Sequence, residues 1–564
     1  MLPCRYLITC GMRYYVLIFF CVLGATAVSA QKNNSLVYDS ALHSLHVKPG
    51  IITLDLKKDF AAPGDGRENS KENSTTTSDH LAFEAAADFI NARGGYVRLL
   101  IPYGTYIVGK QVFNGGKINH FKKYGWGEYA SFDGFDVLLL LKAKNVSIEG
   151  MLSKKGLKPK LQYKPGMRFG LFEIAKGQVN KNNAEAGTTN LYLDRTGLQR
   201  AHIGNTFSFM GCSEIVLRNI EVNGNAAAFT LGGRFGRGKN PYENYHSGIY
   251  ILSSSSVQLL DITLYDLGLD GIAIKDMGAG YGNSDNILIK NCVVTRNGRN
   301  GLSWLSGRNV TVINSGFSEM GRGAISTEPA AGIDIEAETL DLDNVPSLGS
   351  FYNCIIKNNQ WLALAAGVAS LNSKSLPSKK MNFVNCVFVG TYNSVADIES
   401  DEYTFDSCYF YGQLYLRNNS PQEKNATVFT NCDFSNVYKG KRTAGMFLIA
   451  NVGARRTRFK KCNFLAFDQR IFNMDNTTFI CGDYKSYPVY EDCIFKCYLK
   501  EITDGWFKTS GLGGKTSYKG STFYYNARFP FFNDTYCGNM GAQDLGGNKY
   551  IPLKQGEIIS IPKQ

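Results

Sequence analysis

Three acidic residues alternate with apolar residues in the segment 332–338, which reads Gly-Ile-Asp-Ile-Glu-Ala-Glu. Successive side chains of a β-strand face opposite sides, so Asp334, Glu336 and Glu338 are expected on one face. Like charges held this close repel and raise at least one pKa, which is costly unless the arrangement is used. Same-face positions lie ~6.6–7 Å apart along a strand. This is near the ~6.5–9.5 Å between the carboxyl groups of inverting glycosidases, where one carboxyl protonates the leaving oxygen and the other activates water.

Two other interpretations of the acidic segment stay open. Carboxylate oxygens are ligands for hard cations, so the segment could hold a calcium ion. It could also be a solvated acidic edge whose charge is balanced by Lys275 and Arg299. The sequence therefore makes no cofactor certain, with calcium possible, and it assigns no metal ligands.

Four segments with the pattern Gly-apolar-x-apolar can be aligned as neighbouring strands, namely 248–251, 271–274, 301–304 and 332–335. If the apolar partners point inward, the residues between them form an outward row. The members of this first row are Tyr250, Ala273, Ser303 and Asp334. The second row, two residues further on, comprises Leu252, Lys275, Leu305 and Glu336. Neighbouring parallel strands lie ~4.8 Å apart, so both rows would share one surface, with Trp304 inside.

The candidate catalytic residues are therefore Asp334 and Glu336, with Asp270 as a further acid. Asp270 stands at the start of an apolar strand, in Leu-Asp-Gly-Ile. A turn aspartate that bonds only local backbone is an equally good interpretation of Asp270 taken alone.

Five side chains are candidates for substrate binding on the same surface. Arg299 could hold a carboxylate or sulfate bidentately, although surface turn arginines are common. Lys275 and Glu338 lie beside the candidate catalytic residues, and Tyr250 could stack on a sugar ring. His246 follows a glycine-rich basic segment, but a lone histidine is more often structural.

Internal periodicity is the strongest signal in the chain. Short strands of β-branched, aromatic and apolar residues recur, for example at 287–294 and 381–388, frequently around the pattern Asn-Cys-x-Phe/Ile/Val. The recurring asparagines indicate a ladder at a turn; they are Asn291, Asn353, Asn385 and Asn431. A residue type that returns at one repeat position favours a solenoid over a β-sandwich. We therefore expect an all-β protein, a single-stranded right-handed parallel β-helix.

The chain has fourteen cysteines, and seven of them recur at one point of this repeat. Free cysteine behaves as a small buried hydrophobe, so the recurrence predicts an interior stack of thiols. Its expected members are Cys292, Cys354, Cys386, Cys408, Cys432, Cys462 and Cys493. A disulfide among Cys481, Cys493, Cys497 and Cys537 stays an alternative.

A helix is expected over 79–93, capped by Ser78 or Asp79 and ended by Gly94-Gly95. It would cover the exposed backbone at the first coil of the β-helix. The motifs around it are Pro63-Gly64-Asp65-Gly66, Ala82-Phe83-Glu84-Ala85-Ala86 and Ile101-Pro102-Tyr103-Gly104-Thr105-Tyr106. Together they resemble the N-terminal cap of the pectate-lyase-like superfamily. That resemblance implies a right-handed parallel β-helix and a role on carbohydrate polymers.

The resemblance leaves the reaction open, since the superfamily includes lyases, glycosidases and epimerases. The Gly-His-Gly and Arg-Ile-Lys signatures of polygalacturonases are absent. The leading hypothesis is a glycoside hydrolase that uses paired carboxylates. The alternatives are a polysaccharide lyase or C5-epimerase on a uronate glycan, with Lys275, Arg299 or His246 abstracting the proton, and a non-catalytic glycan-binding β-helix.

The first thirty residues read as a signal peptide, with Arg5 and Arg13 before an apolar stretch and cleavage expected near Ala30. This predicts a secreted or periplasmic protein with no membrane span after signal removal. The expected parts are 1–30 signal peptide, 31–130 N-terminal capping region, 131–540 β-helix and 541–564 tail. The formal charge of +13 is spread along the chain, so no nucleic-acid partner is expected, only a polysaccharide or oligosaccharide.

Overall fold

A computed structural model describes residues 50–68, 76–113, 130–175, 178–179, 198–232, 244–277, 282–338, 344–367, 378–390, 394–416, 426–443, 447–451, 457–467, 470–473, 489–498, 517–525 and 543–552. All of them belong to one compact unit, Gly50–Gln564. The expected signal peptide lies outside the described residues, as does most of the expected C-terminal tail.

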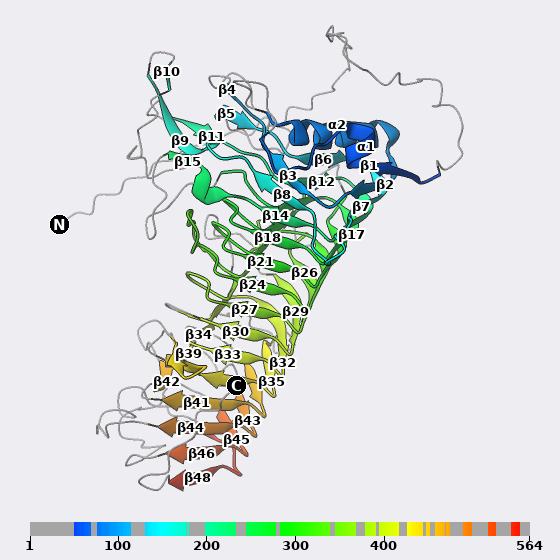
Figure 1. Cartoon of the computed structure of the whole chain (residues 1–564). Helices are drawn as coiled ribbons and strands as arrows, with labels where there is room; N and C mark the ends of the chain where they lie inside the picture. Colours follow the sequence, from blue (N-terminus) through cyan, green and yellow to red (C-terminus); the bar gives the residue numbers. More distant parts are fainter. Residues whose placement is uncertain are drawn as a thin grey trace, which may run out of the picture. The chain divides into compact units, whose positions relative to one another are not determined.

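Three long parallel sheets build this unit, and their strands stack one above the next along its length (Figure 1). Sheet 1 has fifteen strands. They are β1 (Ile52–Asp55), β2 (Gly95–Ile101), β7 (Lys144–Gly150), β13 (Ser213–Arg218), β17 (Ser255–Leu260), β20 (Asp285–Lys290), β23 (Arg308–Ile313), β26 (Ser347–Tyr352), β29 (Lys379–Val384), β32 (Asp401–Asp406), β35 (Val428–Thr430), β40 (Arg458–Lys460), β43 (Val489–Glu491), β45 (Ser517–Lys519) and β47 (Gln543–Asp544).

Sheet 2 has fourteen strands. They are β3 (Thr105–Val108), β8 (Lys160–Tyr163), β14 (Glu221–Asn223), β18 (Thr263–Tyr265), β21 (Val293–Thr295), β24 (Gly316–Ser318), β27 (Ile355–Lys357), β30 (Val387–Val389), β33 (Tyr409–Tyr411), β36 (Asp433–Ser435), β41 (Asn463–Phe467), β44 (Ile494–Tyr498), β46 (Thr522–Tyr525) and β48 (Lys549–Pro552).

Sheet 3 has eleven strands and carries the candidate site. They are β6 (Leu138–Leu141), β12 (Phe207–Met210), β16 (Ile249–Leu252), β19 (Ile272–Lys275), β22 (Leu302–Trp304), β25 (Ile333–Ile335), β28 (Leu364–Ala366), β31 (Ala396–Ile398), β34 (Leu414–Leu416), β39 (Phe447–Asn451) and β42 (Arg470–Asn473). Each coil runs through sheet 3, sheet 1 and sheet 2 before it returns to sheet 3 one strand further on. The predicted parallel β-helix is thereby confirmed.

Two smaller sheets complete the strands of the described residues. A six-stranded sheet contains β4 (Gln111–Phe113), β5 (Ala130–Gly134), β9 (Arg168–Ala175), β10 (Gln178–Val179), β11 (Leu198–Ala201) and β15 (Thr230–Gly232). A two-stranded sheet pairs β37 (Val437–Tyr438) with β38 (Lys441–Arg442). The parallel sheets begin at Ile52 and end at Pro552, so the coils extend beyond the expected 131–540 on both sides.

The N-terminal cap consists of two helices, α1 (Leu56–Phe60) and α2 (Ser78–Arg93). Helix α2 contacts β2, β3 and β6, one strand of each long sheet, so it covers the end of the first coil. Its N-cap is Thr77, whose side chain accepts a hydrogen bond from the His80 amide, so the expected cap by Ser78 or Asp79 is wrong. The buried Asp79 carboxylate instead accepts the backbone N–H groups of Gly64 and Ile107 and ties the cap to the first coil.

Each expected long strand is in fact two short strands in different sheets. The segment 287–294, for example, divides into parts of β20 and β21 at Asn291. Asn291 has a φ of 55°, a left-handed conformation that asparagine tolerates, and this turns the chain from sheet 1 to sheet 2. Side-chain amides join these corners between coils, with Asn385 Nδ2 donating to Asn353 Oδ1 at 2.8 Å. The predicted asparagine ladder is confirmed.

The residue after each of these corners points inward, and seven such positions carry buried cysteines without disulfides. They are Cys292, Cys354, Cys386, Cys408, Cys432, Cys462 and Cys493. An eighth buried free cysteine, Cys212, lies at the turn from sheet 3 to sheet 1. Beside them run two columns of stacked rings, with successive centroids such as those of Phe405 and Phe429 4.7 Å apart. Cys493 is free, so its predicted alternative role in a disulfide is wrong, while Cys481 and Cys537 lie outside the described residues. The interior is therefore a set of apolar columns that repeat coil after coil.

The interior column predicts free thiols that react only after unfolding. Burial raises the pKa of Cys212 and of Cys292 to about 11, which suppresses the reactive thiolate. Alkylation without reductant should therefore leave Cys212 and the seven column cysteines unmodified in the native protein and label all eight after denaturation, as read by peptide mass mapping. Recovery of Cys354, Cys386, Cys408, Cys432 and Cys462 as disulfide-linked peptides would contradict the column.

Candidate functional site

The register of sheet 3 brings the expected first row together. Tyr250 pairs with Ala273, Ala273 with Ser303, and Ser303 with Asp334 in four adjacent strands. Ile333 and Ile335, on either side of Asp334, are fully buried in the core. The alternation and the coil alignment are therefore both confirmed.

The expected exposure of this row is wrong. Asp334 is 2% exposed, Tyr250 6% and Ser303 0%, although all three side chains leave the sheet on its outer side. Strand alternation determines which side of the sheet a residue occupies, but not whether other segments cover that side. Asp334 is consequently a buried carboxyl group and not part of a solvated edge.

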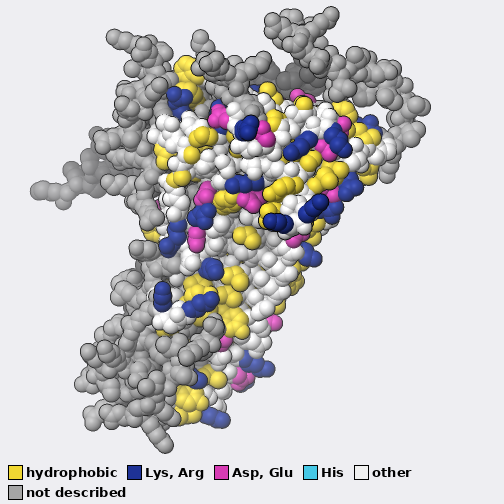
Figure 2. All heavy atoms as spheres, in the orientation of Figure 1, with side chains coloured by type: hydrophobic (Ala, Val, Ile, Leu, Met, Phe, Trp, Pro, Cys, Tyr) yellow, Lys and Arg dark blue, Asp and Glu magenta, His cyan; other side chains and the backbone are white. Residues whose placement is uncertain are grey.

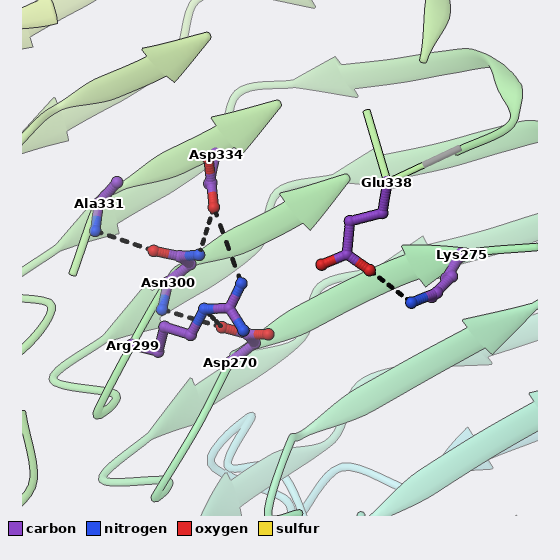
Figure 3. Close-up of polar contacts among 7 residues, drawn as sticks. All are labelled: Asp270, Lys275, Arg299, Asn300, Ala331, Asp334 and Glu338. Carbon is purple, nitrogen blue, oxygen red and sulfur yellow. Dashed lines mark hydrogen bonds and ion pairs between the residues drawn. The ribbon is translucent and has the colours of Figure 1, made fainter. Parts of the chain in front are cut away.

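Asp334 lies in a polar cluster that spans three coils (Figure 3). The side-chain amide of Asn300 donates a hydrogen bond from Nδ2 to Asp334 Oδ2 at 2.8 Å. The guanidinium of Arg299 lies with Nη2 4.0 Å from the same oxygen and with Nε 3.7 Å from Asp270 Oδ1. Arg299 is 8% exposed, and its charge lies between two buried carboxyl groups of the chain. Its predicted contact with a substrate anion stays a prediction.

Asp270 has a structural partner in this cluster. Its Oδ1 accepts the backbone N–H of Asn300 at 3.0 Å, and Asn300 Oδ1 in turn accepts the backbone N–H of Ala331. The same kind of bond occurs on earlier coils. Asp136 Oδ1 accepts the backbone N–H of Asn205, and Asn205 Oδ1 accepts the backbone N–H of Ser247. These side chains form a ladder that satisfies backbone donors at the entrance to sheet 3. The geometry therefore favours the structural interpretation of Asp270 over a catalytic one.

Burial raises the pKa of Asp334 well above the ordinary aspartate value of 3.8. The negative charges of Glu336 and Asp270 act in the same direction. Arg299 and the Asn300 hydrogen bond oppose the shift without cancelling it. Asp334 therefore keeps its proton to a higher pH than an ordinary aspartate, a property typical of a general acid.

The two charged members of the second row are more exposed than the first row, whereas Leu252 and Leu305 are buried. Glu336 is half-buried and follows Asp334 on the outer side of the chain. Lys275 and Glu338 form an ion pair across the intervening coil (Figure 3). The two residues meet although a coil separates them, because both side chains are long enough to cross the strand between them. Among the sequence-predicted acids, Glu336 remains as the neighbour of Asp334 with access toward solvent.

His246 does not lie on the candidate surface. It is fully buried, its Nδ1 accepts the Gly268 N–H at 2.8 Å, and its ring packs against Tyr163, Phe169 and Phe229. Burial lowers its pKa to about 3, so it is neutral at physiological pH. The prediction of a substrate-binding histidine is therefore wrong, and the structural alternative holds.

Tyr250 belongs to a small apolar cluster on the outer side of sheet 3, together with Met210, Leu252 and Ala273. Tyr245 and Met277 pack against the cluster from its edge. The cluster adjoins the polar group around Asp334 along the row, so an apolar and a polar region lie side by side. Trp304, in contrast, lies in the core as expected.

Two features escaped prediction although the sequence contains a signal for each. Asn300 is the residue that holds Asp334, and it stands in Asn-Gly-Leu-Ser, the same spacing as Asn205-Thr-Phe-Ser. A second Asp-Ile-Glu, at 397–399, repeats the motif at 334–336 two strands along the sheet. Asparagine and serine are common at turns, and a three-residue motif is short, so neither signal stands out before the coils are aligned.

No group of three or more His, Cys, Asp or Glu side chains within the described residues is arranged to hold a metal ion. Calcium binding by the acidic segment therefore stays a prediction. Nor is any helix in the described part of the chain long and apolar enough to cross a membrane. On the face drawn in Figure 2, Lys and Arg side chains lie among Asp and Glu side chains.

A family model described as a right-handed β-helix region matches residues 201–340 and 242–410 of the chain. These residues include the candidate site and the coils on either side of it. Together with the three parallel sheets, the match identifies the fold as a right-handed parallel β-helix. No curated protein sequence matches this chain.

Several solved structures are similar to this one at low identity. The A-module of mannuronan C-5 epimerase AlgE6 from Azotobacter vinelandii is 13% identical, with 89% of this chain and 100% of that chain covered and a TM-score of 0.45. Gene product 12 of bacteriophage phi29 is 13% identical, with 84% and 52% covered and a TM-score of 0.44. The tailspike gp49 of Pseudomonas phage LKA1 is 9% identical, with 88% and 77% covered and a TM-score of 0.41.

The raised pKa of Asp334 predicts a pH dependence of stability. At pH values between the ordinary pKa and the raised one, the folded state keeps a proton that the unfolded state releases, so the free energy of unfolding falls as pH rises. Asp334→Asn removes this loss, keeps an acceptor for Asn300 and leaves Asp270 to pair with Arg299. The variant should therefore gain stability over the wild type as pH rises above about 4, at about 1.4 kcal/mol per unit of pKa difference.

Urea unfolding of both proteins between pH 4 and 8 measures this difference. The matched control is Asp285→Asn, whose carboxylate pairs with Arg308 at 3.1 Å on sheet 1 and is partly exposed. The control should lose a little stability, and the loss should not reverse with pH. An Asp334→Asn protein that is less stable than the wild type at every pH would show that Asp334 is held ionised.

Proposed function

We propose that this protein is an exported carbohydrate-active enzyme that cleaves a polysaccharide as a glycoside hydrolase. Asp334 is the general acid that protonates the leaving glycosidic oxygen, and Glu336 is the general base that activates water. The signal peptide expected over 1–30 and the superfamily resemblance of the cap motifs support export and a glycan substrate. The observation that carries the reaction is the buried carboxyl group of Asp334 beside a second, more accessible carboxylate.

A general acid must hold a proton at the working pH and be fixed in place. Burial and neighbouring negative charge raise the pKa of Asp334, which meets the first requirement. The hydrogen bond from Asn300 fixes Oδ2 and leaves the other oxygen to carry the proton, which meets the second. Asn300 is thus a positioning residue, because it acts through Asp334.

Glu336 has the spacing that the second carboxylate requires. It lies two residues from Asp334 on the same side of the strand, a separation of ~6.6–7 Å between Cα atoms. Inverting glycosidases place their carboxyl groups ~6.5–9.5 Å apart, which leaves room for the attacking water. The different exposure of the two groups also separates their roles, since the more solvated carboxylate ionises more readily.

The contacts of the cationic side chains favour hydrolysis over β-elimination. A lyase or C5-epimerase needs a base beside the α-proton of a uronate and a cation on its carboxylate. Lys275 is ion-paired with Glu338, Arg299 lies between two buried carboxyl groups, and His246 is in the core. The three candidate bases are thus held by partners within the chain, and a lyase remains an outcome of the product assay.

Substitution of the two carboxyl groups tests the proposal. Asp334→Asn and Glu336→Gln should each lower kcat by about 10²–10⁴-fold, because a general acid or base contributes that much to the rate. Activity would be measured on a panel of polysaccharides, with new reducing ends reporting hydrolysis and ultraviolet absorbance reporting the unsaturated product of a lyase. Asp285→Asn, on a different sheet, should keep wild-type activity.

Two outcomes contradict the assignment. Wild-type turnover by both site variants would leave the acidic strand without a catalytic role. Loss of activity that added calcium restores would indicate a cation site and favour the lyase.

The pH profile tests the roles of the two groups separately. If Asp334 is the acid, kcat/KM falls as pH rises through its raised pKa, because the proton needed by the leaving group is lost. If Glu336 is the base, kcat/KM falls at low pH as that carboxylate gains a proton. A bell-shaped profile is expected for the wild type. Asp334→Asn would be measured on a substrate with a good leaving group such as p-nitrophenolate, which departs without protonation, and its profile should lack the alkaline limb. An alkaline limb that persists unchanged in this variant belongs to another residue and contradicts the assignment.

A further inference from the structure

The hydroxyl group of Ser303 is buried beside Asp334 with no hydrogen-bond partner in the described part of the chain. Ser303 is 0% exposed, and its Oγ neither donates nor accepts a bond to any protein atom there. A buried hydroxyl left unpaired costs about 1–3 kcal/mol. Such a group is expected where a ligand supplies the missing bond.

The structure contains a matched residue that shows how this hydroxyl loses its partner. Ser208 lies in the same row of sheet 3, three strands away, and is also 0% exposed. Each serine follows an asparagine by three residues. Asn205 donates from Nδ2 to Ser208 Oγ at 3.4 Å, whereas Asn300 donates to Asp334 Oδ2 at 2.8 Å. The Asn300 amide is thus directed to the proposed acid, and Ser303 lacks the asparagine partner that Ser208 has.

The neighbours of Ser303 in the row are a small apolar side chain on one side and the proposed acid on the other. Ala273 pairs with Ser303 from the preceding strand and Asp334 from the following one. Parallel strands lie ~4.8 Å apart, so the free hydroxyl is one strand from the carboxyl group and borders a methyl side chain. A serine hydroxyl both donates and accepts, so its complement is a group that does the same, as a sugar hydroxyl does.

We propose that Ser303 Oγ binds a hydroxyl group of the sugar residue whose glycosidic oxygen Asp334 protonates. This inference rests on the proposed function and adds a substrate contact to it. The site therefore selects a sugar with a free hydroxyl next to the scissile bond. An analogue that lacks this hydroxyl leaves Ser303 unpaired again and loses affinity in the transition state.

The test compares Ser303→Ala with Ser208→Ala in the full-length protein. Ser303→Ala should lower kcat/KM by about tenfold on the hexasaccharide that the wild type cleaves, equivalent to one neutral hydrogen bond. Its thermal midpoint should be unchanged or higher, because an unpaired polar group is removed. Ser208→Ala should keep kcat/KM and lower the midpoint slightly, since the Asn205 amide loses its acceptor.

Four hexasaccharides serve as probes, those of cellulose, xylan, mannan and polygalacturonate, and binding is measured by calorimetry with Asp334→Asn to prevent turnover.

Wild-type kcat/KM in Ser303→Ala, with Asp334→Asn inactive, overturns the Ser303 contact and leaves the proposed function standing. A midpoint for Ser303→Ala well below that of Ser208→Ala also overturns it, because the hydroxyl then has a structural partner. If a hexasaccharide binds without being cleaved, hydrolysis is refuted, and a tenfold weaker Kd in Ser303→Ala still supports the contact. If none binds, both proposals fail.

Discussion

The backbone hydrogen bonds between successive coils constrain everything else in this protein. Because sheets 1, 2 and 3 are parallel and in register, each residue lies directly above the equivalent residue of the previous coil. A side chain at a given position must therefore pack against its own counterpart, at ~4.8 Å. Phenylalanines stack on phenylalanines, thiols lie over thiols, and asparagine amides bond the asparagines of the next corner. A change of residue type within such a column is tolerated only where some other contact replaces the one that is lost.

Around Asp334 the columns are interrupted, and the interruptions depend on one another. Asp270, Asn300 and Ala331 occupy the same column, in which a side-chain oxygen normally accepts the N–H of the next coil. Ala331 has no side-chain oxygen to accept the next N–H. Asp334 lies in the strand that follows Ala331, β25, and Asn300 donates a hydrogen bond from its side-chain amide to it. Ser303 lacks the bond found in the otherwise equivalent Ser208. The carboxyl group, the positioning amide and the unpaired hydroxyl thus lie together at a single local departure from the repeat.

Most of the fold, and the row that contains the site, could be predicted from the sequence. Asn-Cys-x-Phe repeats specify a corner, an inward thiol and an inward ring, and the Gly-apolar-x-apolar segments place Ser303 against Asp334. Burial could not be predicted, because alternation within a strand carries no information about the segments that cover its outer side. The substrate-binding role predicted for His246 was wrong, and the role of Asn300 was missed, for a related reason. Each depends on contacts between coils, and the loops between coils vary in length.

The charges of the buried cluster bear on the state of the proposed acid. Asp270 and Asp334 share Arg299 at 3.7 and 4.0 Å, distances too long for two strong hydrogen-bonded ion pairs. With both carboxyl groups ionised, this nearly dry group would carry an uncompensated negative charge, which is expensive in a medium of low polarity. A proton on Asp334 would make the group of Asp270, Asp334 and Arg299 neutral, and the raised pKa of Asp334 acts in that direction. The two carboxyl groups also differ in their contacts, because Asp270 accepts a backbone N–H whereas Asp334 accepts a side-chain amide.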